Sequence, residues 1–290
     1  MRARTIAGVA LVALWGVVVG LHVRREYFKS DTLILAEGAR ALAPGTYFYA
    51  VEMNGRSIGV ATSRLDTIPE GFLFEDLLRI EVPALGTVHP ASVRTRGRLG
   101  NALQLLDFEF HLESEIGTFH VTGVAADDST LALTMNAGGR GTNQASRIRL
   151  DPSTTLAVAL PLRMAAAGRL DEGREYTARV FDPSAMSDRP VTVRVTGREI
   201  LHVVDSVVQR TGPAHSRMGI WQPLGIDTVP TWVIEESYGG VSVTSWLDQD
   251  GRLVQAESPM GFTLRRMPYE LARERWEREG GDAALAGGYG

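Results

Sequence analysis

The sequence contains no cysteine. This absence excludes disulfide bonds, thiolate metal sites and a cysteine nucleophile, although it leaves the compartment of the protein open. Lysine is nearly absent as well, because Lys29 is the only one in the chain. The glycine-rich stretch at 138–146 therefore lacks the lysine that a phosphate-binding loop needs, and we expect a surface loop there.

A basic surface is also missing from most of the chain. The formal net charge is −4; residues 1–29 carry +4, so the rest of the chain carries −8. Binding nucleic acid requires a face of cationic side chains that neutralises phosphates, so we expect no nucleic-acid partner. With 290 residues, 44% of them hydrophobic, the chain can bury a sizeable core without covalent cross-links.

Charged side chains are absent from Thr5 to Val23, and arginines flank this run on both sides. As a helix it would reach about 28 Å, close to the thickness of the hydrocarbon core of a bilayer. No small-residue cleavage pattern follows, so we predict that residues 1–29 form an uncleaved membrane anchor. A cleaved signal peptide and a buried core helix are the alternatives. We expect a single-pass protein of a bacterial inner membrane, with its body in the periplasm or outside the cell.

Residues 30–268 are expected to form one α+β domain, mainly of antiparallel strands. Apolar and polar residues alternate clearly in 103–114, as in a half-buried strand. Asn54-Gly55, between two alternating stretches, predicts a hairpin turn. Residues 30–45 predict a short helix that ends before Pro44-Gly45.

An alanine- and leucine-rich segment, 153–170, interrupts the strands, and we predict a helix that is kinked or divided at Pro161. Long antiparallel strands on both sides of it suggest a strongly curved sheet, half-barrel-like, with this helix on its concave face. Residues 269–290 are assigned to a carboxyl-terminal amphipathic helix that begins after Pro268 and to a flexible tail.

The stretch "LDQDGR", residues 247–252, places two aspartates and a glycine next to Trp246. A calcium loop would need further oxygen ligands at fixed spacing, ending in a bidentate glutamate, and no such series follows. Alternating segments flank the stretch on both sides. Asp250-Gly251 therefore predicts a hairpin turn, with Trp246 in the core or at its rim.

A metal site is conceivable on one pair of strands. If the turn lies at Glu115-Ile116, His111 faces His120 across the hairpin, and Glu109 and Glu113 lie diagonally on the same polar face. A turn shifted by one residue would place Glu113 opposite His120 instead. Two histidines and a glutamate can bind zinc. The simpler interpretation is a solvated strand face with cross-strand His–Glu pairs. No other cofactor is indicated, and we expect none.

Four stretches carry a resemblance to a known family. They are "WGVVVGLHVRREYF", "YFYAVEMNGRSIGVATSRL", "GREYTARVFDPSAMSDRPVTVRVTGRE" and "SWLDQDGRLVQAESPMGFTLRRMPYELA". Together they resemble the membrane-anchored, extracytoplasmic β domain that precedes the papain-like domain of bacterial transglutaminase-like proteins. The pattern is also similar to uncharacterised periplasmic proteins with a half-barrel like that of outer-membrane lipoprotein carriers. The resemblance implies that the catalytic domain is absent here, and the family's catalytic cysteine has no counterpart.

These observations lead to one main functional expectation and two alternatives. We expect a membrane-anchored, non-catalytic binding or accessory module that contacts an envelope protein and supports a transglutaminase-like enzyme. The first alternative is a half-barrel that binds a lipid or another apolar ligand. The second is a metal-dependent hydrolase that uses His111, His120 and Glu113. Apart from these three, we expect no catalytic residue in the chain.

Overall fold

The computed structural model describes the chain in seven segments. They are residues 31–84, 87–127, 129–137, 144–151, 154–210, 220–238 and 240–278. The predicted anchor at 5–23, most of the glycine-rich loop at 138–146 and the tail after Arg278 lie outside the described residues. Within the described segments, no helix is both long enough and apolar enough to cross a membrane.

One fifteen-stranded sheet forms the body, in the order β8-β7-β6-β5-β4-β3-β2-β1-β15-β14-β13-β12-β11-β10-β9. Neighbouring strands are antiparallel, except that β9 and β10 are parallel. The predicted mainly antiparallel β fold is confirmed. The strands are β1 Gly45–Met53, β2 Arg56–Ile68, β3 Gly71–Ala84, β4 Thr87–Gly100, β5 Leu105–Ser114, β6 Gly117–Asp127, β7 Thr130–Ala137, β8 Gln144–Arg149, β9 Thr155–Leu156, β10 Glu175–Asp182, β11 Ser187–Arg210, β12 Ile220–Tyr238, β13 Val241–Leu247, β14 Leu253–Glu257 and β15 Phe262–Arg266.

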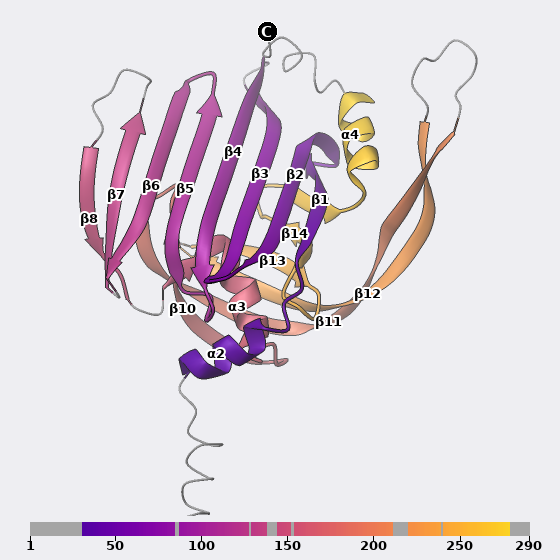
Figure 1. The fold of residues 1–290 in the computed structure, drawn as a ribbon. Helices are drawn as coiled ribbons and strands as arrows, with labels where there is room; N and C mark the ends of the chain where they lie inside the picture. The colour runs from indigo at the N-terminus through magenta and orange to yellow at the C-terminus, as the bar shows by residue number, and fades with distance from the viewer. Residues whose placement is uncertain are drawn as a thin grey trace, which may run out of the picture.

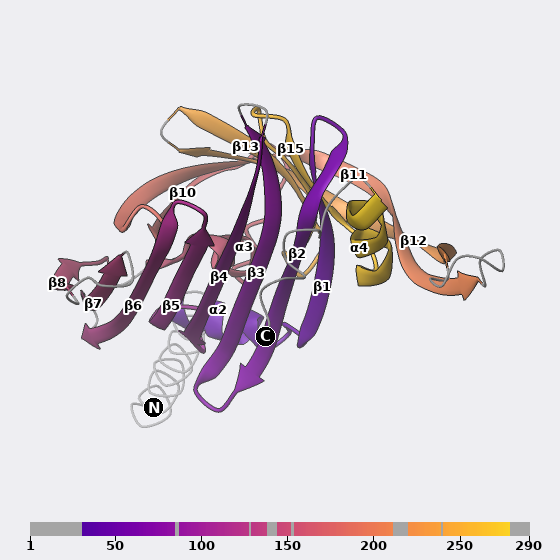
Figure 2. The same ribbon diagram turned by 90° about the horizontal axis from the view of Figure 1, so that it is seen from above.

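The sheet folds over on itself without closing. Strands β1 and β15, from opposite ends of the body, pair in the middle of the sheet, whereas β8 and β9 form its two free edges. The first half, β1 to β8, stands in front of the second half, and helix α3 lies between the two layers (Figures 1 and 2). This arrangement gives the sheet a concave inner face that both halves share.

Sequence alternation decides which side chains reach that inner face. In β5, Phe108 and Phe110 are buried, while Glu109 between them is exposed. The predicted hairpin turn at Asn54-Gly55 is present, and both residues have the positive φ that such a turn requires. The register across the sheet therefore places side chains from successive strands in rows on the concave face.

Helix α2, Asp31–Ala39, matches the predicted short helix and packs against α3, Leu160–Ala166. The approach is so close that a Cβ on Gly38 would lie 1.9 Å from the carbonyl oxygen of Ala166. Together with strands β2 to β7, the two helices enclose the largest hydrophobic cluster of the described residues, which includes Phe181.

The helix predicted over 153–170, kinked or divided at Pro161, is shorter than expected. It has no kink at Pro161, but a separate 3₁₀ turn ends and α3 begins just before this residue. Residues Thr155–Leu156 pair with β10, and Ala157–Ala159 form one turn of 3₁₀-helix before α3 begins. Proline lacks a backbone N–H, so it is tolerated in the first turn of a helix but disrupts the interior. Pro161 lies in that first turn of α3 and therefore interrupts nothing.

The carboxyl-terminal helix α4, Tyr269–Arg278, packs on the body rather than extending away from it. Its Ala272 and Trp276 are buried against Ala50 and Val60, which point to the convex side of β1 and β2. Figure 1 shows α4 beside these strands and near β12. The predicted amphipathic face is thus the one that covers the outside of the sheet.

Candidate ligand cavity

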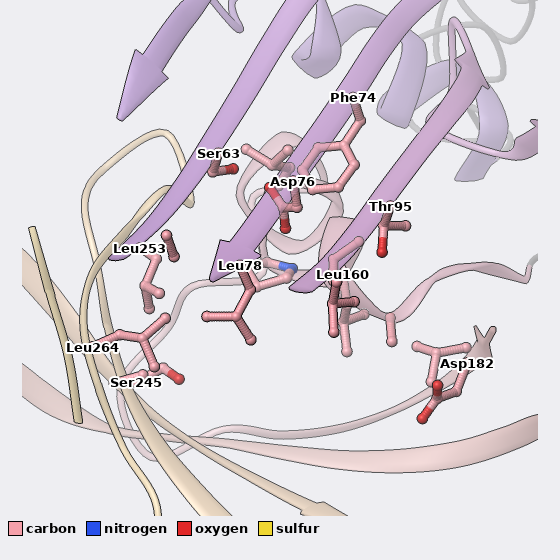
Figure 3. A pocket seen from close by; sticks show the side chains of 18 of the residues that line it. Ser63, Phe74, Asp76, Leu78, Thr95, Leu160, Asp182, Ser245, Leu253 and Leu264 are labelled. Atoms are coloured by element: carbon pink, nitrogen blue, oxygen red, sulfur yellow. The ribbon is translucent and has the colours of Figure 1, made fainter. Parts of the chain in front are cut away.

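A cavity of about 600 Å³ lies on the concave face, between the two halves of the sheet and beside α3. Figure 3 shows side chains from both halves of the sheet and from α3 pointing into it, among them Leu78, Leu264 and Leu160. Most of the lining is aliphatic or aromatic. It includes Tyr47, Tyr49, Ala61, Leu65, Phe74, Leu78, Val93, Phe110, Leu112, Leu160, Leu162, Val180, Val191, Leu247, Leu253, Ala256 and Leu264.

One row of polar side chains crosses this apolar lining. Ser63 on β2 pairs with Asp76 on β3, and Asp76 pairs with Thr95 on β4. Successive strands therefore hold the three side chains side by side, and Figure 3 shows all three at the cavity. The row lies next to the apolar row of Leu65 and Phe74 along the same strands.

Asp76 is the acidic member of that row. Its Oδ1 is inaccessible to solvent and has no hydrogen-bond partner among the described residues. Burial raises the pKa of this carboxyl to about 7, and a hydrogen bond with the Ser63 hydroxyl opposes the rise. Near neutral pH the Asp76 carboxyl can therefore either donate or accept a proton inside the cavity.

A second carboxyl lines the cavity from the opposite half of the sheet. Glu236 lies on β12, paired with Val193 of β11 and Val243 of β13. Its Oε1 is also buried and, within the described segments, has no hydrogen-bond partner. Burial alone raises the pKa of Glu236 to about 7. Two carboxyl groups of altered acidity thus belong to one mainly apolar cavity.

The cationic groups near the cavity are held by other protein atoms. Arg266 donates to the Leu253 carbonyl (Nε to O 2.9 Å), forms an ion pair with Asp248 (3.0 Å) and stacks over the Tyr47 ring. Arg252 donates to the Ala43 carbonyl and lies 4.9 Å from the centre of the same ring. The hydroxyl of Tyr49 donates to the Leu253 carbonyl at 3.0 Å, and burial raises the pKa of Tyr49.

A second ion pair lies at another part of the wall. Asp182 follows Phe181 at the end of β10 and pairs with Arg189, and both residues line the cavity. Asp182 also accepts hydrogen bonds from the backbone N–H and hydroxyl of Ser184, at 2.9 and 2.6 Å. Unlike Asp76 and Glu236, this carboxylate is well supplied with donors.

The stretch "LDQDGR" is a hairpin turn, as predicted. The backbone N–H of Asp248 donates to the carbonyl of Arg252 at 2.9 Å, and Gly251 has a φ of 76°. One Asp248 carboxylate oxygen accepts from the backbone N–H groups of Asp250 and Arg252, so the aspartate organises the turn itself. The turn packs on α3, because a Cβ at Gly251 would lie 2.4 Å from the Pro161 carbonyl oxygen. It forms part of the cavity wall.

The two candidate metal ligands His111 and His120 face each other across β5 and β6, as the first of the two predicted registers requires. Their ring centres are 5.7 Å apart. His120 Nε2 lies 2.9 Å from Glu109 Oε1, whereas Glu113 pairs in register with Thr118. Among the described residues no group of three or more histidines and carboxylates is arranged to hold a metal ion. The zinc site with Glu113 stays a prediction.

Sequence reasoning missed the two cavity carboxyls, although a signal for them exists. In β3 the inward positions read Phe72, Phe74, Asp76, Leu78, and an acidic residue at such a position marks a polar group on an apolar face. Glu236 follows Ile234 at the same spacing in β12. The pattern identifies each carboxyl separately, but only the folding over of the sheet places them around one cavity.

One short stretch matches a catalytic motif in sequence but does not adopt the conformation of that motif. Residues 55–59 read G-R-S-I-G, the spacing of a hydrolase nucleophile elbow, which places its serine on a sharp turn from a strand to a helix. Ser57 instead lies within β2, opposite Glu52 of β1, just after the hairpin turn. The local backbone is a strand, so the geometry of the elbow is not formed.

No family model matches this sequence, and no curated protein matches it. Two solved structures are similar. One is a beta-barrel-like protein of the domain of unknown function DUF1849 from Brucella abortus, with a TM-score of 0.48, 11% identity, and coverage of 78% of this chain and 95% of that one. The other is a DUF1089 family protein from Pseudomonas aeruginosa, with a TM-score of 0.37, 15% identity, and coverage of 70% and 91%. Neither description names a ligand, a partner or a reaction.

Proposed function

We propose that this protein is a non-catalytic binding protein that holds an apolar or amphiphilic ligand on the concave face of its sheet. The observation that carries the proposal is the cavity of about 600 Å³, whose walls are mostly aliphatic and aromatic. Pockets of about 300–1,000 Å³ with apolar walls and a few polar groups are typical of small-molecule sites.

The cavity has polar groups that could orient a ligand as well as an apolar volume that could bind it. Apolar surface provides affinity, and polar groups at fixed positions provide orientation. Here Asp76, Glu236 and the Ser63 hydroxyl are such groups, and strands of both halves hold them in place. A ligand that spans from one half of the sheet to the other would contact both walls.

A neutral fluorescent naphthylamine that brightens in apolar surroundings tests this proposal on the full chain. We expect saturable binding that the variant Ala256→Phe weakens, because Ala256 lines the cavity and the added ring occupies its volume. Ala145→Phe is the matched control, since Ala145 is an exposed residue of β8 outside the cavity. Native mass spectrometry of protein extracted from membranes should show a bound mass. Equal binding by both variants would refute the proposal.

We further propose that residues 5–23 anchor this body to a bacterial inner membrane and that it lies on the extracytoplasmic side, near a transglutaminase-like enzyme. The uncharged run from Thr5 to Val23 and the resemblance to the amino-terminal β domain of that family support this placement. Protease treatment of spheroplasts should digest the body. Crosslinking in membranes should recover the enzyme, and protection of the body from protease would contradict the placement.

A further inference from the structure

We propose that the cavity selects amphiphiles with a primary amine as head group, and that Asp76 and Glu236 bind this cationic head. The inference rests on the proposed function, because it requires that an amphiphile enters the cavity. It adds the chemical class of the head group and the residues that recognise it.

The first support is the unmet hydrogen-bonding capacity of the two carboxyls. Oδ1 of Asp76 and Oε1 of Glu236 are buried and, in the described part of the chain, have no hydrogen-bond partner. Burying a polar group without a partner costs free energy, so a ligand that donates a hydrogen bond to these oxygens would be stabilised. An ammonium group offers three donors and can therefore supply the hydrogen bond that each of these oxygens lacks.

The second support is the distribution of charge around the cavity. Arg189 pairs with Asp182, and Arg266 pairs with Asp248. Among the described residues, no ion pair joins a cation to Asp76 or Glu236. A cationic ligand would therefore complete the charge balance of the site, and in apolar surroundings such a pair is stronger than in water.

An anionic head group is the competing occupant. Arg252 also lines the cavity, and its Nε has no hydrogen-bond partner among the described residues. However, its guanidinium already donates to the Ala43 carbonyl and lies over the Tyr47 ring. Arg189, the other arginine of the lining, forms an ion pair with Asp182. Both arginines therefore already bind protein oxygens, whereas Asp76 Oδ1 and Glu236 Oε1 accept no hydrogen bond among the described residues, so we favour the amine.

Three probes of one chain length separate these possibilities: dodecylamine, dodecanol and dodecanoic acid, each below its micelle concentration. Each is titrated against the naphthylamine bound to the full chain, at pH 8. We expect dodecylamine to displace it at a concentration about tenfold lower than dodecanol, the effect of one charge-assisted hydrogen bond. Asp76→Asn and Glu236→Gln should each remove most of this preference and leave dodecanol unchanged.

The control variant is Asp66→Asn, which removes an exposed carboxylate of β2 that pairs with Arg64. It should leave the amine preference intact, because Asp66 does not line the cavity. Equal displacement by amine and alcohol, or stronger displacement by the acid, would overturn the inference while leaving the proposed function standing. Loss of amine preference in the Asp66 variant would show adsorption to the acidic surface and would also overturn it. If none of the three probes displaces the naphthylamine, the proposed function fails together with the inference.

Discussion

Two neighbouring rows on the concave face differ in how they are filled. The row of Leu65, Phe74 and Gly97 borders the cavity only through Leu65 and Phe74, because its Gly97 end packs tightly on the segment before α3. A Cβ at Gly97 would lie 2.5 Å from a methyl carbon of Leu156. The next row along the same strands, which contains Asp76, borders the cavity. The same three strands thus carry a partly filled row and a hollow row side by side. Sheet curvature alone does not create a cavity; the position of the helix decides which row stays open.

The largest expected difference concerns truncation of a leucine. Leu99 is fully buried in the filled part, whereas Leu78 lines the cavity. Leu99→Ala should lower the free energy of unfolding by about 4 kcal/mol, because it creates a new void in packed surroundings. Leu78→Ala should cost about 2 kcal/mol, since it enlarges an existing space. Urea denaturation measures both, and equal costs would show that the surroundings of Leu99 and Leu78 are packed alike.

A second expected difference is the pH dependence of stability that Asp76, in the hollow row, causes. The pKa of Asp76 is raised to about 7, so the folded protein holds this proton where the unfolded chain has lost it. Stability should therefore fall as the pH rises from about 4 to about 7, by about 3 kcal/mol for this group. Glu236 acts in the same direction, whereas the lowered pKa of Asp66 acts in the opposite one.

Asp76→Asn tests this sign directly. The variant should gain stability relative to the natural protein at pH 8 and gain little at pH 4, as measured by urea denaturation at both values. The difference between the two proteins cancels the background from titrating groups that do not interact with Asp76. A variant that is less stable at both pH values would mean that the Asp76 carboxylate is satisfied in the folded protein.

A third comparison tests the turn that borders the hollow part. Gly251 and Gly173 have nearly the same φ, 76° and 77°, but a Cβ at Gly173 would have no neighbour within 4 Å. Gly173→Ala should cost about 1 kcal/mol for the left-handed backbone alone. Gly251→Ala should cost about 2 kcal/mol or more, because the turn must also move away from Pro161 on α3. Equal melting temperatures for the two variants would argue against the contact of turn and helix.

Much of the fold could be predicted from local patterns. Alternation gave the strands, and the glycines of the Asn54-Gly55 and Asp250-Gly251 turns marked two hairpins whose positive φ values are present. The helix at 153–170 was predicted too long because composition does not show where a chain joins a sheet edge. Thr155 and Leu156 form a strand only through a partner, β10, that follows them in the sequence.

The cavity could not be predicted in the same way, because its walls come from distant parts of the chain. Asp76 and Glu236 are far apart in sequence and line one space only because β1 pairs with β15. The sequences of β3 and β12 each show an acidic residue in an inward position. They do not show which residues face it across the cavity. By contrast, the facing of His111 and His120 was predictable because it depends on the loop of a single hairpin.

The smallest effect is expected on the convex side, behind the filled part of the sheet. His120 and its partner Glu109 are each about half exposed, with side-chain accessibilities of 40% and 51%. His120→Ala should change the free energy of unfolding by less than about 1 kcal/mol, the usual value for an exposed pair. The same denaturation series with added zinc tests the metal hypothesis for His111, His120 and Glu113. If zinc stabilises the natural protein but not the variant, the convex face carries a metal-binding site of its own. Ligand binding would then not be confined to the cavity on the concave face.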